Sequence, residues 1–101
     1  MTNTLPRAEA LELVLRETQR ALAESDESRD VTADESTRLM GSQAPLNSVG
    51  LVSLIISLER EIDARFGRKL ELADDRAMSR RPSPFRTVGT LADYIAERVS
   101  E

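Results

Sequence analysis

The apolar residues of the chain recur at helical spacing in three stretches, which polar segments separate. The first stretch predicts a helix from about Leu5 to Glu24, with Thr4 as its N-cap. Pro6 then falls in the first turn, where its missing N–H costs nothing. The side chains expected to face the core from this helix are Leu11, Val14, Leu15, Thr18 and Leu22.

The clearest helical pattern runs from about Ser48 to Phe66. Asn47 or Ser48 is placed to cap its start, and Gly67 is a typical C-terminal stop. The row expected to face inward is Val52, Ile55, Leu58 and Ile62. Further apolar side chains widen this surface: Val49, Leu51, Leu54 and Ile56. A helix this apolar is either buried among several neighbours or presents an exposed apolar face that binds partners.

The segment from Ser25 to Leu46 is polar and predicts a long connection. Within it, residues 32–35 (Thr-Ala-Asp-Glu) match a capping box, which predicts one short helical turn. Loops of this length are usually either functional or disordered. Four apolar side chains are expected to pin the segment to the core: Val31, Leu39, Met40 and Leu46. We therefore expect an ordered loop.

The last third of the chain predicts two more helices. A brief helix is expected over residues 73–79, and the two prolines that follow predict an extended link, because proline disfavours helix at the residue before it. The final helix is expected to begin at Thr87 or Val88 and to end near Ser100. Its inward side chains should be Val88, Leu91, Ile95 and Val99.

Composition narrows the fold class to all-α. Hydrophobic residues make up 40% of the chain and aromatic residues 3%, so aliphatic side chains must fill the core. Such a profile favours helix over sheet. The length suits one domain, residues 1–101. We predict a four-helix bundle with three longer helices, a short third helix and a long loop between the first and second.

Charge and missing residue types exclude several functions. The chain has no cysteine and no histidine, which rules out disulfides, thiol nucleophiles, Ser-His triads and zinc sites with the usual ligands. We expect no metal site and no enzymatic activity. The net charge of −4 argues against nucleic-acid binding, which needs a basic face. No N-terminal apolar run follows a basic start and no stretch reaches the length of a membrane span, so we expect a cytoplasmic protein that does not insert into membranes. We also expect a monomer.

The residues around Ser48 belong to a pattern that extends along most of the chain. Leu46-Asn47-Ser48-Val49 is followed by Leu58-Glu59 and then by Phe66-Gly67. A stretch from Val31 to Leu39 precedes it, and one from Phe85 to Ile95 follows it. In this order and spacing, roughly residues 5–99 resemble the acyl carrier protein family. That family's signature is Asp-Ser-Leu at the start of the second helix, a Leu-Glu pair and a Phe-Gly stop. The resemblance implies a bundle of the acyl-carrier type.

The resemblance also implies that Ser48 carries 4′-phosphopantetheine, which a phosphopantetheinyl transferase delivers from coenzyme A. Acyl groups would be bound to this arm as thioesters, and the partners would be acyl-loading and acyl-transferring enzymes. The N-terminus of a helix suits the phosphate of the arm. Two neighbours depart from the signature, since Asn47 replaces Asp and Val49 replaces Leu. Asn caps a helix about as well as Asp, but the lost charge can alter recognition by the transferase.

The expected partner surface differs from that of the housekeeping fatty-acid carriers. In that family an acidic second helix docks onto basic surfaces of partner enzymes. Here the second helix is less acidic, so we expect apolar contacts by Val49, Val52 and Ile56 to matter more. Arg80 and Arg81 lie in an arginine-rich link that is either a solvated loop or a second partner surface. These features favour a specialised carrier in envelope lipid, lipopolysaccharide or secondary-metabolite biosynthesis over one in fatty acid biosynthesis.

Two alternatives to this function stay open at the level of sequence. One is an unmodified binding module of the same fold, in which Ser48 only caps the helix and the apolar second helix docks a protein. The other is an amino-acyl or peptidyl carrier, which shares the fold and the serine. Gly50 is also open to two interpretations. It is either a tolerated weakness of about 1 kcal/mol relative to Ala, or a gap that lets the arm or a partner approach closely.

Overall fold

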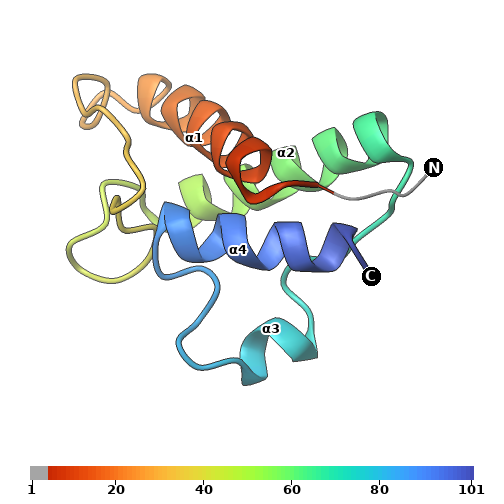
Figure 1. Ribbon diagram of the computed structural model, residues 1–101. Coiled ribbons are helices and arrows are strands. Elements are labelled where there is room, and N and C mark those ends of the chain that lie inside the picture. The colour runs from red at the N-terminus through yellow and green to blue at the C-terminus, as the bar shows by residue number, and fades with distance from the viewer. Residues whose placement is uncertain (1–4) are drawn as a thin grey trace.

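Four helices form the fold of residues 5–101, the part of the chain that the computed structural model describes. They are α1 (Arg7–Ala23), α2 (Ser48–Phe66), α3 (Asp75–Ser79) and α4 (Val88–Val99). In Figure 1, α1 runs in the opposite direction to α2 and α4, and α3 lies on the side of α4 that faces away from α1. The predicted all-α fold, with three longer helices, a short third helix and a long first loop, is confirmed.

The radius of gyration is 12.9 Å, as expected for a compact chain of about 100 residues. Within residues 5–101 no strand is present, and one isolated bridge pairs Arg38 with Thr87. None of the helices in this range combines the length and apolar character that a membrane crossing requires.

Local sequence signals set both ends of α2 and the start of α4. The Asn47 side chain caps α2, and Gly67 stops it in the left-handed conformation at a φ of 64°. Thr87 and Thr90 form a reciprocal capping box at the start of α4. The predicted bounds of α2 are confirmed, and α4 begins at the predicted Val88.

The start of α1 differs from the expectation. Pro6 is the N-cap residue, with an extended ψ of 147°, and does not lie inside the first turn. Its carbonyl oxygen accepts the N–H groups of Glu9 and Ala10, each at 3.0 Å, so the helix begins at Arg7. The predicted cap Thr4 lies outside the described residues.

The core face of α1 is rotated from the predicted one. Val14, Thr18 and Leu22 are buried as expected, whereas Leu11 and Leu15 are only partly buried. Instead Ala10, Leu13 and Glu17 are buried. The physical reason is that α1 packs against both α4 and α2, so its buried face is centred between those two helices. A single helical row read from the sequence cannot show this.

The inner face of α2 is also only partly as predicted. Leu58 and Ile62 are buried, but Val52 is exposed and Ile55 is partly buried. Leu54 takes the inward position, because the face of α2 that meets α1 is shifted by one row. All four inward side chains predicted for α4 are buried.

The α1–α2 loop is ordered by polar pairing as much as by apolar anchors. Leu39 and Leu46 are buried as predicted, whereas Val31 and Met40 are exposed. The predicted helical turn at residues 32–35 is absent from the structure, where a tight turn follows Asp34. The carboxylate of Asp34 accepts the N–H of Ser36 at 2.8 Å.

Backbone pairing with the start of α4 explains why no helix forms there. The N–H of Val88 donates to the backbone carbonyl of Thr37, and the N–H of Leu39 to that of Arg86, each at 3.0 Å. Backbone groups committed to this pairing are not available to a helix.

Candidate functional site

Ser48 is the first residue of α2 and its side chain is exposed. The capping position belongs to Asn47, whose Oδ1 accepts the N–H of Gly50 at 2.8 Å. The Ser48 hydroxyl makes no hydrogen bond to any other residue of the range 5–101. Ser48 therefore does not serve as the cap, and its hydroxyl is free.

The first backbone amides of α2 are free too. Asn47 takes the N–H of Gly50 through its side chain and the N–H of Leu51 through its carbonyl, at 2.9 Å. The N–H groups of Ser48 and Val49 find no acceptor among residues 5–101, as is usual in a first helical turn. No acidic residue lies in this turn. The arrangement gives a partly positive helix end beside an exposed hydroxyl.

Close packing inside the first turn accounts for Gly50. A Cβ added there would lie 3.2 Å from Cδ2 of Leu46 and 3.4 Å from Oδ1 of Asn47. Leu46 is buried, so its side chain anchors the residues that lead into the helix. The glycine therefore makes room for this chain's own anchor and cap. This is a third explanation, beside the two that the sequence suggested.

A shallow hollow lies beside the start of α2 and contacts the end of α1. It has a volume of about 270 Å³ and is lined by small, apolar and hydroxyl side chains and one carboxylate, that of Glu24. Asn47, Val49 and Gly50 contribute to it from the candidate site. The end of α1 and the residues that follow it, Glu24 and Ser25, thus share this hollow with the residues on either side of Ser48.

The three apolar residues expected to meet partners all lie on the outer surface of α2. Val49 is 73% exposed, Val52 55% and Ile56 44%. No charged residue occurs between Ser48 and Ser57. This part of α2 is an exposed, uncharged helical face next to the free hydroxyl.

Arg80 contacts α4 within the molecule. It pairs with Glu97 and lies over the ring of Tyr94, with its guanidinium carbon 5.1 Å from the ring centroid. The hydrogen bond with Glu97 raises the pKa of Arg80 and lowers that of Glu97. Arg81 is exposed and donates to the carbonyl of Met78 at 3.3 Å.

Figure 1 shows α3 well apart from the start of α2. Asn47, Ser48 and Val49 are consecutive at the start of α2, whereas Arg80 directly follows α3 and pairs with α4.

A polar network that the sequence did not reveal joins α3 to α4. Asp74 caps α3 by accepting the N–H of Ala77 at 3.0 Å, and it also accepts from Tyr94 and Arg98 at 3.2 and 3.0 Å. The backbone bond from Ala77 lowers the pKa of Asp74 most, and Tyr94 and Arg98 lower it further against the effect of burial. Burial acts to lower the pKa of Arg98, but the Tyr94 hydroxyl and Asp74 outweigh it and raise that pKa.

Besides this network, the sequence did not single out Ser28. It is buried within a polar loop, and its Oγ donates to the carbonyl of Pro45 at 2.6 Å. No periodic pattern marks it, because irregular loop backbone decides which of several loop serines turns inward. Within residues 5–101, no group of three or more carboxylates is arranged to hold a metal ion.

Comparison of the chain with protein-family models, with curated proteins and with solved structures gives no match in any of the three. The site must therefore be interpreted from its own residues and geometry.

Proposed function

We propose that this protein is an acyl carrier that holds acyl groups as thioesters on a 4′-phosphopantetheine arm attached to Ser48. The observation that carries the proposal is the division of roles at the start of α2. Asn47 caps the helix, so the exposed Ser48 hydroxyl has no structural task within residues 5–101. The resemblance of the surrounding residues to acyl carrier proteins names the modification that would use such a hydroxyl.

The residues present fit a phosphodiester at this position. The Ser48 oxygen is accessible, and the free amides of Ser48 and Val49 favour a negative group at the helix end. No carboxylate in the first turn repels it. When bound, the arm supplies the thiol that this cysteine-free chain lacks. Asn47 then caps the first turn of α2, and Ser48 holds the arm at the start of that helix.

The expected partners are a phosphopantetheinyl transferase and the enzymes that load and remove the acyl group. Val49, Val52 and Ile56 offer them an apolar contact next to Ser48. Because this half of α2 carries no charge, association should depend less on ionic strength than it does for an acidic carrier helix. The neutral Asn47 and this uncharged face support a specialised carrier, in envelope lipid, lipopolysaccharide or secondary-metabolite biosynthesis.

Intact-mass measurement tests the proposal directly. The purified protein is incubated with coenzyme A and a transferase of broad specificity, and the mass is recorded for the natural chain, Ser48→Ala and Ser53→Ala. Ser53 is a matched control, because it is an exposed serine on the same helix. The mass of one phosphopantetheine should be added to the natural chain and to Ser53→Ala, and none to Ser48→Ala. No added mass on the natural chain with several transferases would refute the proposal.

A further inference from the structure

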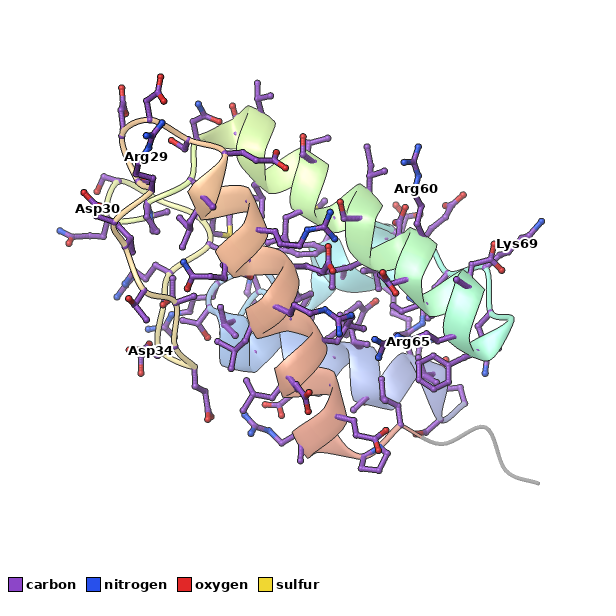
Figure 2. The ribbon with its side chains drawn as sticks, turned by 90° about the horizontal axis from the view of Figure 1, so that it is seen from above. Arg29, Asp30, Asp34, Arg60, Arg65 and Lys69 are labelled. Carbon is purple, nitrogen blue, oxygen red and sulfur yellow. The ribbon has the colours of Figure 1, made fainter. Side chains whose placement is uncertain are left out.

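Ser28 is a buried polar residue in a loop whose neighbouring side chains face water. It is 5% exposed, whereas Glu27 and Arg29 on either side are exposed. Figure 2 shows Arg29 and Asp30 on the loop at the end of the bundle where α2 begins. Two backbone turns hold Ser28 itself, since its N–H donates to Ser25 at 3.1 Å and its carbonyl accepts from Val31 at 3.0 Å. Its inward orientation is therefore fixed locally.

The partner of Ser28 is the segment that leads directly into the candidate site. Its Oγ donates to the carbonyl of Pro45 at 2.6 Å, across 17 positions of sequence. Leu46, the next residue, is buried, and Asn47 caps α2. The entry segment, residues 45–47, is thus held at three consecutive positions: by Ser28, by the core and by the first turn of the helix.

Each of the three attachments restrains a different freedom of the backbone before Ser48. Burial of Leu46 fixes how deep the segment lies, and the Asn47 cap fixes the first turn of α2. The bond from Ser28 fixes the peptide plane between Pro45 and Leu46. Without that bond the peptide can rotate, and the carbonyl loses its partner in the loop. The cap and the hydroxyl that follow would then sample more than one orientation.

We propose that Ser28 is a positioning residue for the modification of Ser48, acting through Pro45 on the entry segment. The inference rests on the proposed function. A transferase needs the serine oxygen in line with the phosphorus that it attacks, so a hydroxyl presented in several orientations reacts more slowly. A hydrogen bond of ordinary net strength corresponds to about a fivefold change in the population of the held state.

Kinetics of arm transfer test this role. The specificity constant of one transferase, with coenzyme A saturating, is measured for the natural chain, Ser28→Ala, Ser28→Thr and Ser42→Ala, below the onset of unfolding of each. Ser42 is a control serine, exposed in the same loop. Ser28→Ala should lower kcat/KM about fivefold. Ser28→Thr keeps the hydroxyl but adds a methyl group at a buried position, so it should retain more of kcat/KM than Ser28→Ala does. Ser42→Ala should stay near the natural value. An unchanged kcat/KM for Ser28→Ala, or an equal loss in Ser42→Ala, overturns the proposal.

A second measurement separates this inference from the proposed function. Amide hydrogen exchange at Gly50 and Leu51, whose N–H groups Asn47 holds, reports the first turn of α2 without any transferase. Ser28→Ala should accelerate exchange at both amides about fivefold, with α4 amides unchanged. If the natural chain is never modified, the proposed function fails whatever the exchange data show. If modification occurs but exchange and kcat/KM are unchanged in Ser28→Ala, only the role of Ser28 fails.

Discussion

At Gly89 the loop between α1 and α2 lies directly against α4, and Gly89→Ala tests that contact. A Cβ at position 89 would lie 2.9 Å from Cγ of Glu35 and 3.2 Å from the Glu35 carbonyl oxygen. That same carbonyl accepts the Gly89 N–H at 2.9 Å. The methyl group would therefore push the loop backbone away from the helix and lengthen this bond.

The expected loss of stability in Gly89→Ala is the sum of two unfavourable contributions and one favourable one. Forcing a methyl into a packed site costs about 1–3 kcal/mol. Weakening the hydrogen bond to Glu35 lowers the stability by about 1 kcal/mol more, whereas the better helix propensity of alanine raises it by about 1 kcal/mol. The expected net loss for Gly89→Ala is about 2 kcal/mol. In a domain of this size that corresponds to a fall in Tm of roughly 8–16 °C.

Urea unfolding followed by circular dichroism measures this loss, with Gly50→Ala as the matched control. At position 50 the nearest atoms belong to the side chains of Leu46 and Asn47, at 3.2 and 3.4 Å, and no backbone atom is among them. Gly50→Ala should therefore lose less stability than Gly89→Ala, about 1 kcal/mol or less, because the helix-propensity gain offsets part of the crowding. Gly89→Ala at or above natural stability would refute the reasoning, and so would equal losses in both variants.

Two further predictions concern polar groups at helix starts. The native pKa of Asp74 lies below its ordinary value of 3.8, so its ionised contacts stabilise the fold above about pH 4, and this stabilisation disappears as pH falls through the native pKa. Asp74→Asn should therefore lose stability near neutral pH and show a smaller fall in Tm between about pH 6 and pH 3; an unchanged acid dependence would contradict this account. Asn47→Ala, which removes the cap of α2, should cost about 1 kcal/mol in chemical unfolding, whereas Asn47→Asp should cost little. Equal stability of the natural chain and Asn47→Ala would show that the cap contributes nothing.

Much of the candidate site could be predicted from local sequence. Helix starts and stops depend on residues within a few positions, so Asn47, Gly67 and Val88 mark the ends of α2 and the start of α4 correctly. The exposure of Val49 and Ile56 also agrees with their expected availability to partners. Only atomic positions could divide the roles at the helix start between Asn47 and Ser48, since both residue types are good caps.

The rest of the fold depended on contacts between residues far apart in the chain. The spacing of apolar residues predicts Val52 on the inner face of α2, but Leu54 is buried there, because the side of α2 that meets α1 cannot be read from periodicity alone. The turn after Asp34 replaces the predicted helical turn because its backbone pairs with the start of α4. Arg80 is paired with Glu97 on α4, which an arginine-rich stretch by itself does not reveal.

The sequence by itself determined the number of helices, their approximate ends and the place of Ser48 at a helix start, since each depends on local backbone preference and on the spacing of apolar residues. Only the tertiary structure decided which faces are buried, why glycine stands at position 89 and how Ser28 reaches Pro45. Those features join segments more than 15 positions apart. Local propensity carries no information about such pairs, because their geometry exists only once the helices have packed.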